Sequence, residues 1–373
     1  MTQLSPFRHK SGVLISRASH LLVAAIILAS LVIWPGFARA GDVFQLTSDA
    51  SSALIDKAKA AVVQVRSGDK GLVSAGTGFF IDDQGTVLTS SSIIGDNNSA
   101  RVVINGVEMD AKILGNDSRS GLAMLQVAYG ASPLLPLAHS SGLQTGDGVI
   151  AIGYPLNLPV ASAQGPVSGF DASFLAHFDP TLPTKASVAA VERFATTHIH
   201  ANIPISPGQV GGPLLNSRGE VVGLVATSPD DGRSIYALPV EAIAKIVADF
   251  NQYGHAKFGW VGVNVTGQTD TLHDGRTVRV VQIVPGTPAS ESGIKVGDTI
   301  MRIDAREIYR PSDVLDASFF SQVGSNMNVV VRRDDTLYNY KFAVIERPQN
   351  PSTVTIPVAA GSALPSHVAA SPR

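Results

Sequence analysis

Few side chains in this sequence could act together as a nucleophile and a base. The chain has no cysteine, so a nucleophile would have to be a hydroxyl group, and disulfides and thiolate metal sites are excluded. His198 and His200 lie two apart on a predicted strand and share one face, where they could act as bases, bind a metal or simply face solvent. Ser206 and Asp117 also have ordinary structural explanations. No serine, histidine and aspartate set can be assembled from these residues.

Composition and charge restrict the classes of protein to which this chain can belong. The 373 residues correspond to about two domains. Hydrophobic residues make up 45% and charged residues 16%, which excludes a disordered chain. The first 40 residues carry four basic and no acidic side chains, which leaves 24 basic against 30 acidic residues in the rest. An acidic body argues against nucleic acid as a partner.

The N-terminus has the pattern of a secretory signal. An apolar run from Leu21 to Trp34, broken only by Ser30, is followed by a helix-breaking Pro-Gly pair and by Ala38-Arg39-Ala40. A helix of this length falls short of the roughly 30 Å hydrocarbon core of a bilayer. We therefore expect a signal peptide cleaved after Ala40 and a periplasmic protein; the alternative is an uncleaved anchor in the inner membrane that faces the periplasm.

Short apolar runs punctuated by glycine, asparagine and proline predict a mostly β domain between residues 61 and 236. A helix is expected at Pro239–Phe250, and a second, smaller unit with two short helices, Ala289–Gly293 and Ser312–Ser321, follows a polar boundary. The expected divisions are a signal peptide over 1–40, domains over 41–253 and 254–348, and a disordered Pro/Ala/Ser-rich tail over 349–373. The predicted strands of the first domain are Ala61–Arg66, Gly78–Ile81, Val87–Thr89, Arg101–Ile104, Leu122–Val127, Val149–Gly153, Ile199–Ile203 and Val221–Ala226.

Five stretches, in this order and spacing, resemble the HtrA/Deg family of exported trypsin-like serine proteases that carry a PDZ domain. They are Gly76–Asp82 (GTGFFID), Asp117–Val127 (DSRSGLAMLQV), Thr145–Pro155 (TGDGVIAIGYP), Pro207–Leu214 (PGQVGGPL) and Arg218–Gly223 (RGEVVG). The resemblance implies an all-β dominated chain, with a trypsin-like double β-barrel followed by a small α+β PDZ domain.

The same resemblance implies positions for a Ser-His-Asp triad, and this sequence departs from the family there. Ser92 falls where the family has histidine, Gly121 where it has aspartate, and Val210 where it has the nucleophilic serine. A hydroxyl is no base near pH 7, glycine has no carboxylate and valine has no nucleophilic atom. We therefore expect a pseudoprotease, not an enzyme, that binds peptides or unfolded envelope proteins. The alternatives are an active HtrA-type endopeptidase with a relocated or non-standard site, and a structural subunit of a mixed oligomer.

Two binding sites are implied by the resemblance. Gly208, Gln209 and Val210 would form an oxyanion-hole-like loop, although its glycines also suit a tight turn. The PDZ groove would take a C-terminal peptide as an added strand. Its expected residues are Trp260, Val261, Gly262 and Val263 on the loop and strand, with Leu315 and Phe319 on one helix face. Ordinary core packing is the alternative for these apolar residues.

No metal or cofactor is expected. The expected partners are protein or peptide C-termini, unfolded envelope proteins and, by analogy, HtrA relatives in a homo- or heterotrimer, with Val43-Phe44 as a packing segment. A membrane is expected as a partner only if the signal segment stays uncleaved. The stretch Gly169–His198 is longer than the corresponding family loop, so we weigh a contact surface for another subunit against neutral drift.

Overall fold

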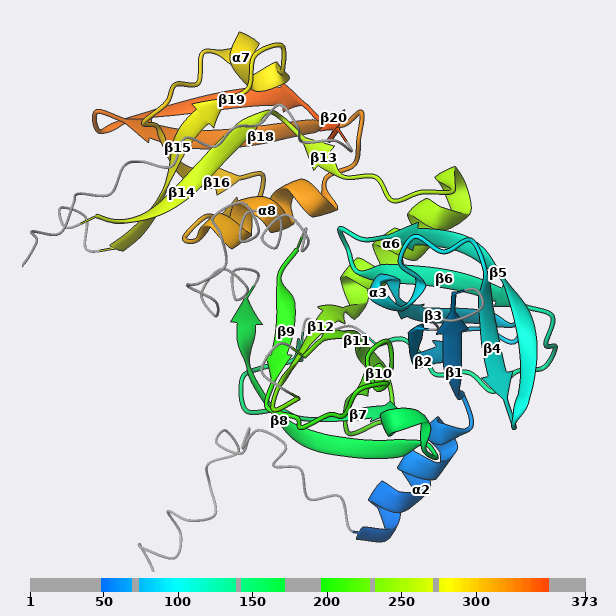
Figure 1. Ribbon diagram of the computed structural model, residues 1–373. Coiled ribbons are helices and arrows are strands. Elements are labelled where there is room, and N and C mark those ends of the chain that lie inside the picture. Colours follow the sequence, from blue (N-terminus) through cyan, green and yellow to red (C-terminus); the bar gives the residue numbers. More distant parts are fainter. Residues whose placement is uncertain are drawn as a thin grey trace, which may run out of the picture. The chain divides into compact units, whose positions relative to one another are not determined.

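The computed structural model describes residues 48–68, 74–138, 142–171, 196–228, 232–270 and 275–348 (Figure 1). The signal segment, Val43-Phe44, the tail after residue 348 and most of the long stretch between Gly169 and His198 lie outside the described residues.

The first barrel is built from six antiparallel strands closed in the order β1-β2-β3-β6-β5-β4. Large apolar side chains fill it because successive strand residues alternate between its inside and outside; Phe80 and Leu125 are completely buried. Its strands are β1 (Val62–Ser67), β2 (Ser74–Phe80), β3 (Thr86–Ser90), β4 (Ala100–Ile104), β5 (Val107–Asp117) and β6 (Leu122–Val127).

The second barrel repeats this design in the order β10-β11-β12-β9-β8-β7. Its interior contains the fully buried Ile199, Leu214 and Ile235. Its strands are β7 (Gly148–Gly153), β8 (Ala161–Asp171), β9 (His198–Ala201), β10 (Pro213–Leu215), β11 (Val221–Thr227) and β12 (Ile235–Pro239). The two closed barrels confirm the predicted trypsin-like double barrel.

Helices cover and connect these barrels. Helix α2 (Ser48–Lys59) precedes β1, and the short α3 (Ser91–Ile94) follows β3 directly. Helix α6 (Val240–Tyr253) begins after Pro239 and ends at Gly254, whose left-handed φ of 75° lets its N–H donate to the Phe250 carbonyl. Each helix in the described part of the chain is too short or too polar to serve as a membrane span.

The C-terminal unit is a small α+β PDZ domain with strands in the order β14-β15-β16-β18-β19 (Figure 1). Strand β14 lies at one edge of this sheet, and α8 covers the apolar core. The elements are β13 (Gly259–Trp260), β14 (Val263–Asp270), β15 (Gly275–Ile283), α7 (Pro288–Ser292), β16 (Thr299–Ile303), β17 (Arg306–Glu307), α8 (Pro311–Phe320), β18 (Asn326–Arg333), β19 (Thr336–Ala343) and β20 (Ile345–Glu346). The two predicted helices of this unit are confirmed as α7 and α8, each shifted by one residue.

Four strands of the barrels were not predicted from the sequence: the short, buried β10 and β12, and the long β5 and β8, which lack apolar runs. Strand β5 is eleven residues long and largely exposed, yet it pairs with β4 on one side and β6 on the other. Strand β8, of the same length, reads ASAQGPVSGFD and pairs with β7 and β9. Their neighbours, rather than their own hydrophobicity, fix them in the barrels.

Candidate functional site

The residues implied at the triad positions come from segments that the fold brings together. Ser92 lies in α3, Gly121 in the turn before β6, and Val210 in the loop before β10. The Ser91 N–H donates to the Gly121 carbonyl over 2.9 Å, which joins the first two segments. The Val210 carbonyl accepts from the Thr77 N–H over 2.9 Å, on strand β2 beside β3.

Ser92 presents an exposed hydroxyl beside a buried one. The Oγ atoms of Ser90 and Ser92 lie 2.8 Å apart, and Ser90 also accepts the Ser92 N–H as the cap of α3. Ser90 is only 1% exposed, whereas Ser92 faces solvent. The pair therefore links a solvent-accessible hydroxyl to the interior of the fold.

The Gly121 position is a left-handed turn that suits glycine. Its φ is 78°, and its N–H donates to the Asp117 carbonyl over 3.0 Å. The Asp117 carboxylate accepts the Ser120 N–H over 2.7 Å, and burial raises the pKa of this carboxyl group. Asp117 therefore stabilises the turn itself.

The loop over residues 206–212 is held in place by Thr77, a residue to which the sequence analysis gave no role. Thr77 is fully buried, and its hydroxyl donates to the Gly208 carbonyl over 2.7 Å while accepting the Tyr154 N–H over 3.0 Å. Gln209 closes the turn, since its N–H donates to the Ser206 carbonyl and its side-chain oxygen accepts the Ser206 N–H. These bonds fix the direction in which the loop presents its peptide groups.

Two backbone donors of this loop have no protein acceptor. Among the described residues, the N–H groups of Gly208 and Val210 make no hydrogen bond, while those of Gln209, Gly211 and Gly212 all do. Position 208 requires glycine, because its φ of 97° is left-handed and a Cβ there would overlap the Tyr154 carbonyl oxygen. The loop thus offers a pair of donors of the kind that polarise a peptide carbonyl or bind a carboxylate.

A strained turn lies against the same loop. Leu156 and Asn157 both adopt left-handed backbone angles, with φ of 50° and 60°. The Leu156 N–H donates to the Pro207 carbonyl over 2.7 Å, and the Asn157 side chain accepts from Gln64 Nε2 over 2.7 Å. Leu156 is nevertheless 61% exposed, so neighbouring hydrogen bonds rather than side-chain burial maintain its unfavourable conformation.

The sequence favoured a solvated strand face shared by His198 and His200. The structure contradicts this expectation. His198 is 1% exposed, its Nδ1 lies 2.9 Å from the Thr196 carbonyl oxygen, and burial lowers its pKa to about 4. His200 stacks on Tyr236 with ring centroids 4.5 Å apart. Within the described ranges, no three His, Asp or Glu side chains gather as a metal site.

The PDZ domain contains an apolar cavity of about 220 Å³ between β14 and α8. Trp260, Val261, Val263 and Leu315 line it, as the sequence analysis placed them. Phe319 does not: it is 1% exposed and packs on Phe258 with ring centroids 5.6 Å apart. The groove assignment of Phe319 is corrected accordingly, because α8 has neighbours on more than one face.

Other residues shape this cavity. Gly262 is not among its lining residues but forms the turn before β14 with a φ of 92°, where a Cβ would overlap the Thr287 side chain. Ser318 and Arg347 do line the cavity and were missed. The i, i+4 spacing could have indicated Ser318 next to Val314 on the same helix face, whereas Arg347 follows the last strand and had no such signal.

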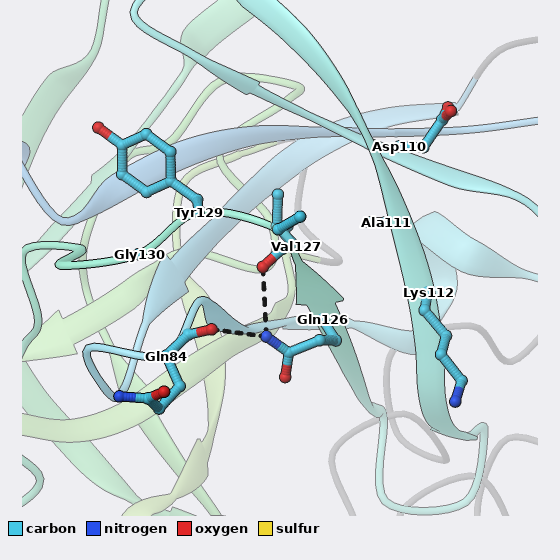
Figure 2. Close-up of a pocket in the computed structure, with 9 residues that line it drawn as sticks. Gln84, Asp110, Ala111, Lys112, Gln126, Val127, Tyr129 and Gly130 are labelled. Atoms are coloured by element: carbon cyan, nitrogen blue, oxygen red, sulfur yellow. Dashed lines mark hydrogen bonds between the residues drawn. The ribbon is translucent and has the colours of Figure 1, made fainter.

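A larger, open concavity of about 720 Å³ lies on the outside of the first barrel, along β5 and β6 (Figure 2). Figure 2 shows Tyr129 and Lys112 on opposite sides of it and the Gln126 side chain between them. Gln126 Nε2 donates to the carbonyl oxygens of Gln84 and Val127 over 2.7 and 3.2 Å. None of its described lining residues is a serine or histidine, so it does not offer a nucleophile and base.

Comparisons with known proteins identify both domains. Residues 76–224 match the trypsin-like peptidase domain, and residues 259–344 match the PDZ domain. The chain is 28% identical over 284 residues to the "Probable periplasmic serine endoprotease DegP-like" of Hahella chejuensis, covering 73% of this chain and 57% of that protein. It is 30% identical over 262 residues to the "Putative serine protease HhoA" of Synechocystis, covering 64% and 62%.

A solved structure named "HtrA-type protease AlgW with tripeptide" superimposes with a TM-score of 0.66 at 23% identity, covering 81% of this chain and 98% of that one. This likeness shows the shared fold. The chain spans 57% to 63% of the length of the first curated relatives that it matches.

These relatives overturn one expectation from the sequence. The expectation of a non-hydrolytic pseudoprotease that is no enzyme is wrong, because the related proteins are named serine endoproteases and serine proteases. The expected fold and family, in contrast, are confirmed. With its trypsin-like peptidase domain followed by one PDZ domain, the chain belongs to the HtrA family.

Proposed function

We propose that this protein is an exported HtrA-type serine endopeptidase that acts on unfolded polypeptides through a non-standard catalytic site. Its PDZ groove binds the C-terminal residues of the polypeptide, and its double barrel cleaves the chain. The observation that carries the proposal is the loop of Gly208 and Val210, whose two unpaired N–H groups lie in a trypsin-like barrel. The serine protease names of the relatives support the same reaction class.

The PDZ groove has the features that strand addition requires. The outer edge of β14 is unpaired within the described sheet, so an extended peptide can add to it by backbone hydrogen bonds. The cavity beside this edge is lined mainly by aliphatic side chains, which suit an apolar residue of the peptide. Val263 and Val265 face it from the strand and Leu315 from the helix.

We assign the nucleophilic hydroxyl to Ser92. It is exposed and lies in the segment that packs next to the 206–212 loop, since a Cβ on Gly211 would contact the Ser90 backbone. The N–H groups of Gly208 and Val210 would stabilise the negative oxygen that forms when the hydroxyl adds to a peptide carbonyl. Hydroxide from solvent would take the proton of the attacking hydroxyl and water would protonate the leaving amine, while Ser90 Oγ, 2.8 Å away, holds that hydroxyl by a hydrogen bond.

This arrangement predicts slow turnover with a distinctive pH profile. Neither hydroxyl of the pair is a base near pH 7, so the site lacks the activation that a triad histidine provides. Serine proteases without a working triad retain about 10³ to 10⁴ over the uncatalysed rate, from the oxyanion hole and substrate binding. We therefore expect a rate in that range, rising continuously with pH instead of reaching a plateau near pH 7.

The test is prolonged incubation of the purified chain with reduced, carboxymethylated casein at pH 7 and pH 9, with cleavage products identified by mass spectrometry. A fluorophosphonate probe is applied in parallel to locate the reactive serine. Ser92→Ala should abolish cleavage and labelling, whereas the matched control Ser162→Ala, an exposed serine on β8, should preserve both. Absence of cleavage by the unaltered protein, or cleavage that survives Ser92→Ala, would refute the assignment.

Export and assembly belong to the same proposal. Relatives named periplasmic support export to the periplasm, with the signal over residues 1–40 removed after Ala40. N-terminal sequencing of the protein recovered from a periplasmic extract should begin at Gly41. We further propose a trimer, which light scattering at several concentrations would detect as three times the monomer mass.

A further inference from the structure

The chain leaves the PDZ domain beside the peptide groove. Strand β20 ends at Glu346, and the backbone N–H of the next residue, Arg347, donates to the Phe258 carbonyl over 2.8 Å. Arg347 also lines the cavity between β14 and α8, and Pro348 is the last residue that the structure describes. The segment that follows Pro348 therefore starts at one end of this cavity.

The sequence beyond this point contains a short run that suits an edge strand. Thr353–Val358 reads TVTIPV, and five of its six residues are β-branched, the type that favours strands. Val354, Ile356 and Val358 alternate with two threonines and a proline, so three apolar side chains share one face when the run is extended. A proline near its end is compatible with an edge strand, which needs hydrogen bonds on one side only.

This TVTIPV run matches the groove in shape and charge. The outer edge of β14 is unpaired among the described strands, and Val263, Val265 and Leu315 line the cavity beside it. Residues 349–372 contain no Asp, Glu, Lys or Arg, so the run can enter an apolar groove without dehydrating a charge. Backbone hydrogen bonds to β14 and burial of the aliphatic side chains would stabilise it there.

The connection to the run is long enough and short enough for this contact. Ile356 follows Pro348 by eight residues, which span up to about 26 Å when extended, so the run can reach the part of β14 that borders the cavity. A segment on so short a tether has an effective concentration of about 1 mM at the groove. It would occupy the groove for about nine-tenths of the time even if its intrinsic Kd were about 0.1 mM.

We propose that the TVTIPV run adds to the free edge of β14 in the same molecule, so that the chain covers its own peptide groove and a captured polypeptide must displace it. Its aliphatic side chains enter the cavity beside Leu315. The inference goes beyond the proposed function, because it concerns what occupies the groove before a polypeptide arrives, and it is independent of the catalytic assignment.

Hydrogen exchange followed by mass spectrometry tests the contact without an added ligand. A chain that ends at Pro348 should exchange the amides of β14 faster than the full-length chain, because the outward N–H groups of that edge lose their acceptors. Val354→Asp in the full-length chain should have the same effect, since a carboxylate is costly to bury in an apolar cavity. The matched control is Val368→Asp, which introduces the same charge outside the run and should leave the exchange unchanged.

Peptide affinity measures the competition. Fluorescein-labelled decapeptides with a free C-terminus and random apolar residues at the last three positions are titrated by fluorescence anisotropy. They should bind the chain that ends at Pro348, and the Val354→Asp variant, about tenfold more tightly than the full-length chain or Val368→Asp. Thermal melting of each variant shows whether the PDZ domain remains folded.

The outcomes separate this inference from the proposed function. If the decapeptides bind but neither truncation nor Val354→Asp changes their affinity or the exchange of β14, peptide capture stands and self-occupation of the groove is overturned. If none of the chains binds the decapeptides, peptide capture fails, and the exchange of β14 alone decides whether the run covers this edge. Protection of β14 that disappears on dilution of the full-length chain would place the run on a second copy and overturn the inference.

Discussion

Thr77 is the residue through which the geometry of the candidate catalytic loop can be tested most directly. Thr77→Val replaces the hydroxyl by a methyl group of similar shape. The change leaves the Gly208 carbonyl and the Tyr154 N–H without the partner that they have at 2.7 and 3.0 Å. An unsatisfied buried group costs about 1 to 3 kcal/mol, so the two together predict a loss of about 2 to 6 kcal/mol in the free energy of unfolding.

Thr77→Ser is the matched control, because it keeps both hydrogen bonds and removes one methyl group, worth about 1 kcal/mol. Urea denaturation followed by far-UV circular dichroism gives both values, and hydrogen exchange reports on the amides of residues 208–212. Thr77→Val should lower the stability more than Thr77→Ser and should speed exchange in this loop. If the two variants unfold at the same urea concentration and loop exchange is unchanged, Thr77 does not hold the loop.

Three further changes test other features. Leu156→Asn should raise the melting temperature by about 2 to 4 °C in a thermal scan, because asparagine tolerates the left-handed φ of 50° and little burial is lost; a lower melting temperature would contradict the inferred strain. Burial lowers the pKa of His198 from 6.5 to about 4, so between pH 6.5 and pH 4 the imidazole takes up a proton when the protein unfolds. The free energy of unfolding should therefore fall by up to about 3 kcal/mol as the pH drops through this range. Urea midpoints of His198→Asn should lack this component, and an unchanged pH profile would refute it. Gly262→Ala should abolish binding of free-acid peptides in the anisotropy assay, since its φ of 92° and the Thr287 side chain leave no room for a Cβ; unchanged affinity would show that the loop can adjust.

The strands that the sequence predicted bury apolar side chains, although the short buried strands β10 and β12 were missed as well. Val221–Ala226 was expected and lies within β11, and its valines and leucine are all buried. Strand β5 was not expected, since Glu108, Asp110 and Lys112 all occur in it. Such a strand is specified by pairing partners that are distant in sequence, which no local pattern reports.

In the candidate sites too, local sequence patterns predicted some residues and missed those that act through distant contacts. Glycine-rich strings located the 206–212 loop, because left-handed turns restrict the choice of residue. Thr77 and Arg347 were missed as site residues, since each acts on segments far away along the chain. The i, i+4 spacing of Leu315 and Phe319 placed both on one helix face but could not show that Phe319 meets Phe258 instead of the groove.

The prediction that failed was the one about enzymatic activity, which was made from three local positions in the sequence. The residue types at positions 92, 121 and 210 favoured a protein without activity, whereas the related chains are named serine proteases. A missing side chain excludes one mechanism; it does not exclude another constellation on the same scaffold.

The closure of both barrels has a consequence for how this protein meets aggregation-prone chains. In a closed barrel every strand is hydrogen-bonded on both sides, so neither barrel can template the growth of a foreign β-sheet. Among the described strands of the sheet β14 to β19, the outer two remain open to such pairing. A foreign strand can therefore add only at the outer edges of this sheet among these three structures, and at β19 it would meet the exposed side chains of Leu337 and Tyr338.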